Sequence, residues 1–350
     1  MHILDHPAKH IDLFQCPACA AGMAIENNEL RCRGAEAHRY PVEGGIPRMF
    51  CENNWDGRGD VTDAIRSFYE DTPFPNYDDL DDTFALMQKA ERSVFGRMLN
   101  DQIPFNVNVL EVGCGTGQLA NYLGVAHRTV FGTDMTVNAL KLAQDFKAKN
   151  NLDHVGFYQM NLFRPIFKPE SFHVVLCNGV LHHTSDPHGG FRSIANLVKP
   201  GGYLLVGLYN AYGRLATDIR RRVFSLFGDQ LSFLDPYLRK SKISAAKQRA
   251  WFRDQYKNPH ESKHTIDEAL GWFDAAGFEF ESGVPPLVLG DRFSPQYPLF
   301  KPHARGTKRD HALVQMKLIL TGSREGGFFI IVGKKRQYAA SKDQSKLTMA

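Results

Sequence analysis

Between residues 107 and 210, short apolar runs alternate with stretches of helical pattern. The apolar runs read VNVLEVG, TVFGTD, GFYQMN, SFHVVLCNG and GGYLLVGLY, and helices are expected over 117–124, 136–149 and 188–198. Strands that alternate with helices pair in parallel, because each helix carries the chain back to the same edge of the sheet. The sequence therefore predicts an α/β fold with a doubly wound, mostly parallel sheet that has helices on both faces.

The chain is longer than one typical domain of about 100–200 residues, so a large domain with a small appendage is expected. Prolines within Thr72–Tyr77 interrupt a helical pattern, and Thr265 with Glu268 has the spacing of a helix capping box. We expect a small β-rich module at 1–50, a linker and helical lid at 51–101, an α/β core at 102–210, a basic helical insertion at 211–264, the completion of the sheet at 265–336 and a flexible tail at 337–350.

Composition narrows the class of protein. With 43% hydrophobic and 23% charged residues, the chain reads as an ordinary soluble globular protein. A net charge of +4 does not by itself indicate nucleic-acid binding, and it leaves an anionic substrate open. The apolar runs are shorter than the roughly 18–20 residues that cross a bilayer, and the N-terminus lacks a signal-peptide pattern. Six scattered cysteines do not form a disulfide framework, so we expect a cytoplasmic protein.

Three glycines follow the first strand of the core, in EVGCGTG, and lead directly into a helix. Glycines at Gly113, Gly115 and Gly117 allow a sharp turn with no side chain in the way of a ligand. About twenty residues further on, Asp134 ends the second strand, where a carboxylate can bind both hydroxyls of a ribose. Polar residues also end the third strand, at Asn161, and the fourth strand, at Asn178.

Over residues 95–210 the sequence resembles the class I S-adenosylmethionine (SAM)-dependent methyltransferases. EVGCGTG matches the first motif of that family, and LVKPGGYLLVG at 197–207 resembles the loop before its fifth strand. The resemblance implies a Rossmann-like methyltransferase core that binds SAM across the carboxyl ends of the strands. Glu111 and Gly113 would lie near the methionine moiety, Gly115 and Gly117 beneath it, Asp134 and Met135 at the ribose, Asn161 and Leu162 at the adenine, and Asn178 and Gly179 on the methionine side. Asn161 departs from the family, which more often has aspartate there.

A dinucleotide-binding Rossmann domain is the alternative for this core. Its fingerprint is G-x-G-x-x-G, whereas here the third glycine follows after one residue, and no second nucleotide-binding half follows in the sequence.

Candidates for the acceptor side follow the fourth and fifth strands. Neutral imidazole accepts protons near pH 7, so His182 and His183 are the candidate bases, with packing as the alternative role for either one. Tyr209 would face the acceptor. Phe68 and Tyr69 would cover the adenosine or the sulfonium, where an aromatic face favours positive charge, or would pack in the core. The stretch from Pro73 to Tyr77 would act as a lid over the site or as a plain connector.

The first fifty residues contain candidate metal ligands. Cys16, Cys19, Cys32 and His38 offer a soft donor set for one tetrahedral zinc. The segment resembles the Trm112-like zinc-ribbon family, which occurs free or fused to methyltransferases and usually has a fourth cysteine. Here that ligand would be His38 or Cys51, and a remnant without metal is the alternative.

The insertion carries ten Lys or Arg residues between Arg214 and Arg253, interleaved with aromatic and aliphatic side chains. It would contact an anionic substrate, a partner protein or a membrane surface, or form a solvated face over a buried stripe.

We expect an enzyme that methylates a small or medium-sized metabolite on oxygen, nitrogen or carbon. The alternatives are an RNA methyltransferase, because a ribbon before such a domain also resembles the 23S rRNA guanine-N1 enzymes, and a non-catalytic subunit that activates a partner.

Overall fold

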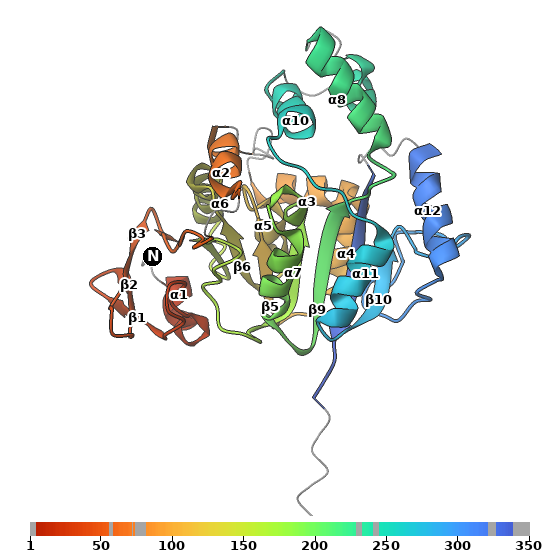
Figure 1. The fold of residues 1–350 in the computed structure, drawn as a ribbon. Coiled ribbons are helices and arrows are strands. Elements are labelled where there is room, and N and C mark those ends of the chain that lie inside the picture. Colours follow the sequence, from red (N-terminus) through yellow and green to blue (C-terminus); the bar gives the residue numbers. More distant parts are fainter. Residues whose placement is uncertain are drawn as a thin grey trace, which may run out of the picture.

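A mixed β-sheet runs through the centre of the molecule (Figure 1). The structure is a computed structural model that describes residues 5–55, 59–71, 73, 82–228, 233–240, 245–320 and 327–338. Within these residues the central strands are β5 (Asn108–Val112), β6 (Thr129–Asp134), β7 (Val155–Gln159), β8 (Phe172–Asn178), β9 (Val198–Tyr209), β10 (Phe278–Val284) and β11 (Phe328–Lys335). Their order is β10-β11-β9-β8-β5-β6-β7. Strands β5 to β9 pair in parallel, and β11 is antiparallel to both β9 and β10. The predicted doubly wound, mostly parallel sheet is confirmed.

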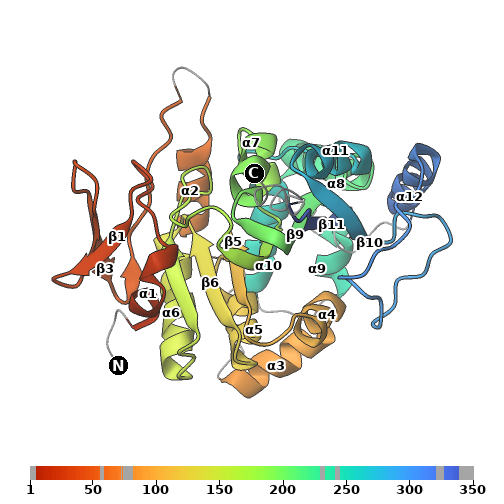
Figure 2. The same ribbon diagram turned by 90° about the horizontal axis from the view of Figure 1, so that it is seen from below.

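Helices cover both faces of this sheet (Figure 2). One face carries α3 (Thr83–Arg92), α4 (Val94–Gln102), α5 (Gln118–Val125) and α6 (Val137–Lys149), and the other carries α7 (Pro187–Ala195) and α11 (Ile266–Ala275). Successive strand residues point to opposite faces, so Leu110 packs in one core and Val109 in the other. Burial on both sides explains why the strands read as continuous apolar runs. The predicted capping box of Thr265 and Glu268 begins α11.

Residues 5–50 form a small antiparallel sheet beside the β7 edge, with α1 and a short 3-10 helix (Figure 1). Its elements are α1 (Asp5–Lys9), η1 (Ile11–Leu13), β1 (Met23–Glu26), β2 (Glu29–Cys32), β3 (Arg39–Glu43) and β4 (Ile46–Pro47). Beyond β4, Arg48 forms a parallel bridge to Gln159 of β7. Phe14 packs on Tyr158 with ring centroids 5.2 Å apart. The small sheet therefore shares a core with the central sheet.

Helices from the predicted lid and insertion lie over the carboxyl ends of the parallel strands. They are α2 (Thr62–Asp71), α8 (Leu215–Phe227), α9 (Pro236–Lys240) and α10 (Ala245–Lys257), and α12 (Lys308–Leu320) follows later in the chain. Glu70 joins α2 to the start of α6, because its carboxylate accepts hydrogen bonds from the backbone N–H of Val137 (2.6 Å) and Asn138 (2.9 Å).

Two further expectations concern segments that are mostly not described. Of the proline-aromatic stretch Thr72–Tyr77, only Pro73 belongs to the described residues, and residues 339–350 of the predicted tail also lie outside them. Within the described part of the chain, no helix is long and apolar enough to cross a bilayer. The six cysteines are free thiols.

Candidate active site

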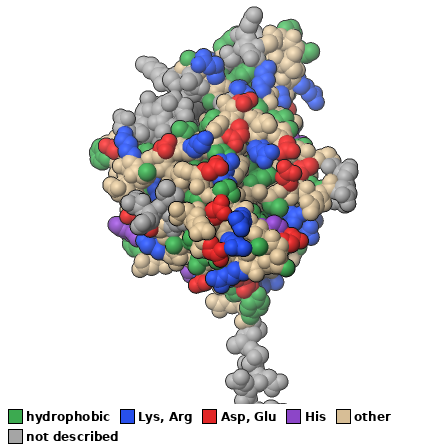
Figure 3. Space-filling model, turned by 90° about the vertical axis from the view of Figure 1, so that its left-hand side faces the viewer, with side chains coloured by type: hydrophobic (Ala, Val, Ile, Leu, Met, Phe, Trp, Pro, Cys, Tyr) green, Lys and Arg blue, Asp and Glu red, His purple; other side chains and the backbone are tan. Residues whose placement is uncertain are grey.

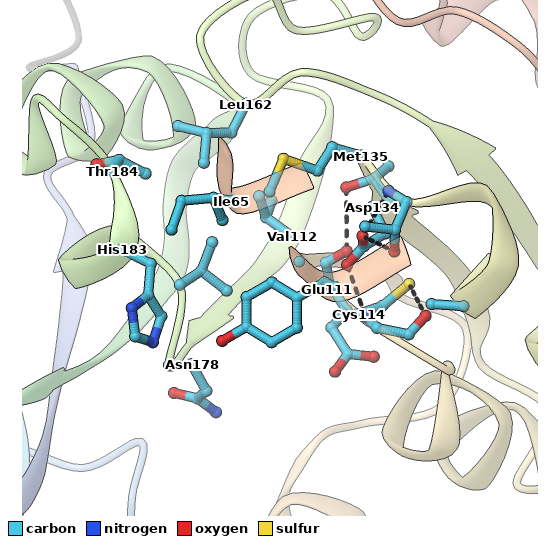
Figure 4. A pocket seen from close by; sticks show the side chains of 18 of the residues that line it. Ile65, Glu111, Val112, Cys114, Asp134, Met135, Leu162, Asn178, His183 and Thr184 are labelled. Atoms are coloured by element: carbon cyan, nitrogen blue, oxygen red, sulfur yellow. Dashed lines mark hydrogen bonds between the residues drawn. The ribbon is translucent and has the colours of Figure 1, made fainter. Parts of the chain in front are cut away.

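A cavity of about 590 Å³ opens where β5, β6 and β8 end. Its walls come from the glycine turn after β5, the ends of β6 and β8, and helices α2 and α10. In Figure 4, Asp134 with its hydrogen bonds lies on one side, and His183 and Thr184 lie on the other. Of the predicted site residues, those that line the cavity are Tyr69, Glu111, Gly113, Gly115, Asp134, Met135, Asn161, Leu162, Asn178, Gly179, His183 and Tyr209.

Backbone geometry explains the glycines of the turn between β5 and α5. Gly113, Gly115 and Gly117 have φ values of +69°, +52° and +69°, in the left-handed region that glycine adopts most readily. A Cβ on Gly113 would lie 2.3 Å from Val180, and one on Gly117 would lie 2.5 Å from the ring of Phe157. Gly113 and Gly115 line the cavity, whereas Gly117 precedes α5 and serves the packing beneath it.

Asp134 fastens the glycine turn to the end of β6. Its Oδ2 accepts from the backbone N–H of Gly115 at 2.8 Å, and its Oδ1 accepts from the N–H and hydroxyl of Thr136 at 2.8 and 2.7 Å. Burial raises the pKa of Asp134, and the hydrogen bonds from Thr136 and Gly115 oppose that rise. Met135 and Leu162 line the cavity beside it and provide apolar surface.

Two buried acceptors near the turn have no hydrogen-bond partner, namely Oε2 of Glu111 and Oδ1 of Asn178. Burial raises the pKa of Glu111 to about 8, with a smaller contribution in the same direction from Asp134. Buried polar atoms in native proteins are nearly always satisfied, so these two call for a donor from a ligand. The nearby Gly179 leaves open space where a Cβ would stand. This side of the cavity fits a small cationic or hydrogen-bond-donating group.

Asn161 uses most of its side chain for other contacts. Its Nδ2 donates to the backbone oxygen of Cys51 (2.8 Å) and to Oδ1 of Asn53 (2.9 Å). Its Oδ1 accepts from the N–H of Phe163 at 3.0 Å. Asn161 therefore ties the segment after the small sheet to the end of β7, and only its Oδ1 has room for a further hydrogen bond.

The two adjacent histidines have different positions. Nδ1 of His183 lies 2.9 Å from the backbone oxygen of His260. A carbonyl can only accept, so Nδ1 carries the proton and Nε2 presents a lone pair. Burial lowers the pKa of His183, which keeps the ring neutral near pH 7. His182 is fully buried and does not line the cavity, and its ring packs 4.0 Å from that of Tyr209.

Helices α2 and α10 meet over the cavity through a hydrogen-bond network. The hydroxyl of Tyr69 donates to Oδ1 of Asp254 at 2.8 Å. Nε2 of Gln255 donates to the other oxygen of Asp254 and to the hydroxyl of Tyr209, both at 2.9 Å. Phe68, predicted to cover the adenosine or to pack, lies instead under the guanidinium of Arg253 at 5.2 Å and does not line the cavity.

Sequence reasoning missed the contribution of α10. Trp251, Asp254 and Gln255 all line the cavity. They lie in a basic helical segment about forty residues beyond the last predicted site residue, with no motif around them. The residues WFRDQ at 251–255 match no known motif. Nothing in their pattern distinguishes a helix that lines a cavity from a helix that faces solvent.

The cationic groups of this region lie behind the cavity wall. The guanidinium of Arg214 is fully buried, 3.8 Å from the ring of Tyr209, and donates to both carboxylate oxygens of Glu261. Among the described residues that line the cavity, there is no Lys and no Arg. An anionic group on a ligand would therefore find no fixed positive side chain there.

The small N-terminal sheet gathers the four predicted metal ligands. The donor atoms of Cys16, Cys19, Cys32 and His38 lie within 4.8 Å of one another. Nδ1 of His38 faces the sulfur of Cys16 at 3.6 Å, while its Nε2 contacts Glu36 at 2.9 Å. Burial alone would raise the pKa of Cys16, but hydrogen bonds, the strongest from Tyr40, lower it to about 7. The cluster could hold a metal ion.

Comparisons with known proteins agree with this geometry. Residues 110–206 match the profile of the methyltransferase domain family. An uncharacterised Synechococcus protein is 24% identical over 49% of this chain and 47% of its own length. The ubiquinone biosynthesis O-methyltransferase of Klebsiella pneumoniae is 33% identical over 31% of this chain and 46% of that enzyme. The chain spans about half the length of these curated relatives.

Among solved structures, magnesium protoporphyrin IX methyltransferase from Synechocystis with bound SAH aligns with a TM-score of 0.46 and 15% identity, over 78% of this chain and 99% of that chain. The profile match runs from β5 into β9 and includes the glycine turn, Asp134 and Asn178. The chain therefore contains a class I SAM-dependent methyltransferase domain, with a small antiparallel sheet that carries a Cys/His cluster at its edge.

Proposed function

We propose that this chain binds SAM in the cavity and methylates a small, uncharged acceptor. The observation that carries the proposal is the pair of buried, unpartnered acceptors, Glu111 Oε2 and Asn178 Oδ1, beside a glycine turn fastened to Asp134. The methionine end of SAM carries an α-ammonium and an α-carboxylate on one carbon, and two methylene carbons link that carbon to the sulfonium. A buried carboxylate and an amide oxygen provide the acceptors that the ammonium needs.

Each part of SAM has a matching set of residues. Glu111, Asn178 and Gly179 would hold the methionine moiety over Gly113 and Gly115. Asp134 would bind the ribose hydroxyls, and Met135 and Leu162 would flank the adenine, with Asn161 offering only its oxygen. The ring of Tyr69 would face the sulfonium, where the negative face of an aromatic ring favours a cation. Phe68 and Gly117 would act indirectly, by supporting Tyr69 and the turn.

For the transfer step, His183 is the proposed base. When bound, SAM supplies an electrophilic methyl group. Nε2 of neutral His183 accepts the proton that the acceptor atom loses, and the hydrogen bond from Nδ1 to the oxygen of His260 fixes the ring. The hydroxyl of Tyr209 accepts from Gln255, so its own proton is available to orient the acceptor. We assign no direct contact to His182, because it lies behind Tyr209.

The walls of the cavity support an uncharged acceptor. The acceptor side combines Tyr209, Trp251 and Phe328 with the neutral His183 and with Asp254, whose two oxygens already accept from Tyr69 and Gln255. No Lys or Arg occurs among the described lining residues. A base that is neutral near pH 7 suits an acidic hydroxyl, and several curated relatives are named O-methyltransferases. We therefore propose oxygen as the acceptor atom.

A small acceptor is favoured over RNA by the covered cavity and by the charges on the face that carries the N-terminal sheet. Helices α2 and α10 cover the cavity through the contact of Tyr69 with Asp254. Figure 3 views the side of the N-terminal sheet and shows Lys and Arg interspersed with Asp and Glu. Nucleic-acid binding requires a continuous basic surface instead.

We also propose one structural zinc ion at Cys16, Cys19, Cys32 and His38, as the Trm112-like resemblance implies. The donor set is the kind that zinc prefers, and the contact of His38 with Glu36 supplies an acceptor for the other ring nitrogen. Cys51, the alternative ligand, is not part of the cluster.

Calorimetry with purified full-length protein tests the cofactor assignment. SAM should bind and NAD should not. Asp134→Asn should weaken SAM binding by about 1.5–3 kcal/mol, because it replaces a charged acceptor with a neutral one. Asp145→Asn, at an exposed position of α6, is the matched control and should bind SAM like the wild type.

A methyl-label transfer assay on fractionated extract tests the acceptor class. Label should appear in the small-molecule fraction. Label confined to RNA, with binding that weakens steeply as salt rises, would replace the proposal by RNA methylation. A protein that binds no SAM would support the activator hypothesis.

A further inference from the structure

Helix α8 has apolar side chains on two opposite faces. Leu215, Ile219 and Leu226 follow one another at intervals of four and seven residues, so they share one face of the helix. This face is open to solvent, with exposed fractions of 44%, 63% and 77% for the three side chains. The opposite face carries Phe224, which is buried and packs on Tyr256 with ring centroids 4.7 Å apart. One apolar face of α8 is thus used for packing and the other is not.

The exposed apolar surface continues beyond the stripe. Phe227, at the end of α8, is 67% exposed, and the next described side chains along the chain, Phe233 and Leu234, are exposed as well. Folded proteins rarely leave such a run of large apolar side chains in water unless it contacts something. We call Leu215, Ile219 and Leu226 the outer face of α8, and Phe227 extends the exposed apolar surface at the end of the helix.

The insertion that contains α8 exposes basic rather than acidic side chains in its described part. Among the described residues of the insertion 211–264, the exposed charged side chains are Arg222, Arg239, Arg249 and Lys257. Arg222 lies on the outer face itself, between Ile219 and Leu226. Each described acidic residue of the insertion has a partner: Asp218 pairs with Lys263, Asp235 accepts from Tyr256, Asp254 accepts from Tyr69 and Glu261 pairs with Arg214.

We propose that the outer face of α8 docks on an anionic phospholipid surface. An interfacial helix places large apolar side chains at the boundary of headgroups and acyl chains, and its Arg and Lys contact the lipid phosphates. A second copy of this chain fits less well, because a symmetric contact through this face would bury two copies of the basic Arg222 with no acidic side chain on the described part of the face to pair with them.

Docking at this face would bring the cavity to the membrane. Helix α8 packs on α10 through Phe224 and Phe252, at 5.2 Å, and α10 supplies Trp251 to the cavity wall. Figure 1 shows α8 and α10 together beyond the carboxyl ends of the strands. An acceptor that partitions into lipid would then be held close to the helices that cover the cavity.

Cosedimentation of the full chain with vesicles tests this proposal. We expect binding to vesicles of phosphatidylcholine and phosphatidylglycerol in a two-to-one ratio, weak binding to pure phosphatidylcholine, and a loss of binding as salt rises. The double variant Ile219→Glu/Leu226→Glu should reduce the bound fraction about tenfold or more, because it places two carboxylates against the lipid. Phe84→Glu, on α3 and 67% exposed, is the matched control and should bind like the wild type.

Three results would overturn the proposal. These are wild-type protein that stays in the supernatant with both vesicle types, a double variant that binds as well as wild type, or a wild-type dimer that the double substitution converts to monomers. Thermal unfolding shows whether the variants are folded. SAM calorimetry without vesicles is independent of this surface, so a failure of the proposed function and a failure of docking are distinguishable.

Discussion

Glu111 shows how one buried carboxyl can make cofactor binding depend on pH. Its pKa is raised from 4.5 to about 8, so the free protein holds this proton at pH 6 and 7. The ammonium of SAM binds the ionised form, so binding below about pH 8 releases a proton. SAM affinity should therefore rise with pH, by up to about tenfold per pH unit, and level off above pH 8. Calorimetry at several pH values and in buffers of different ionisation enthalpy measures both effects.

The matching variant is Glu111→Gln, which should bind SAM more weakly at pH 8 and show little dependence on pH. Glu91→Gln, at an exposed position of α3, should retain the wild-type profile. A wild-type affinity that is constant from pH 6 to pH 8 would contradict the assignment of Glu111 to the methionine moiety.

Substitution of His183 should affect catalysis, whereas substitution of His182 should affect stability. His183→Ala should lower kcat about 10²–10⁴-fold with little change in the Kd of SAM, because it removes the proposed base. In the wild type, kcat should fall only below the ordinary histidine pKa of 6.5, since burial lowers the pKa of His183. His182→Ala should instead lower the free energy of unfolding by about 2–3 kcal/mol, because it leaves a cavity next to Tyr209.

Steady-state kinetics and thermal unfolding of both variants separate these outcomes. A His183→Ala enzyme with wild-type kcat would remove His183 from the transfer step, whatever its effect on stability.

At the scale of whole elements, the sequence predicts the central strands well, but it predicts poorly the helices α2 and α10 that cover the cavity. Strands β5 to β9 are apolar runs whose boundaries are set by local residues such as the glycines after β5, so the runs and their flanking residues identify them. Their carboxyl ends then meet at one edge because the pairing is parallel. This brings Glu111, Asp134 and Asn178 together, although they are distant in sequence.

The missed residues depend on contacts between elements. Trp251 and Asp254 reach the cavity only because α10 packs on α8 and meets Tyr69 of α2. His182 and His183 occupy one short 3-10 turn. The orientation of that turn decides which of the two histidines faces the cavity, and the residue types alone do not show it. Asn161 lines the cavity, and its amide also holds residues 51–53, a contact between distant segments that the sequence does not indicate.

The joint between α2 and α6 should control access to the cavity. Glu70 caps α6 with a carboxylate at its N-terminus, where negative charge is favourable. Glu70→Ala should lower the free energy of unfolding by about 1–2 kcal/mol and weaken SAM binding, because Ile65 and Tyr69 of α2 line the cavity. Denaturant unfolding and calorimetry measure the two effects.

Asp63→Ala is the control on the same helix, since it removes only an exposed ion pair with Arg66. Such pairs contribute about 0–1 kcal/mol. If Glu70→Ala and Asp63→Ala change SAM binding equally, α2 is not held in place by the Glu70 contact.

For the molecule as a whole, the small N-terminal sheet is connected to the cavity through one edge of the central sheet. Nε of Arg48 donates to the side-chain oxygen of Gln159 at 2.7 Å. Two residues along, Asn161 holds the segment 51–53 and also lines the cavity. A change in the small sheet can therefore alter the cavity wall at Asn161 and leave the glycine turn unchanged.

Removal of the proposed zinc should for this reason weaken SAM binding. Metal affinity contributes directly to the folding of a small module, so a chelator or Cys32→Ser should loosen the sheet that holds Arg48 and Asn53. Coupling through packed elements amounts to about 0.5–2 kcal/mol, which corresponds to a rise of roughly 2- to 30-fold in the Kd of SAM. Metal analysis should find one zinc per chain in the wild type and in Cys51→Ser, the control, which lies outside the cluster. A Cys32→Ser protein that has lost its metal and still binds SAM like the wild type would show that the two sites are independent.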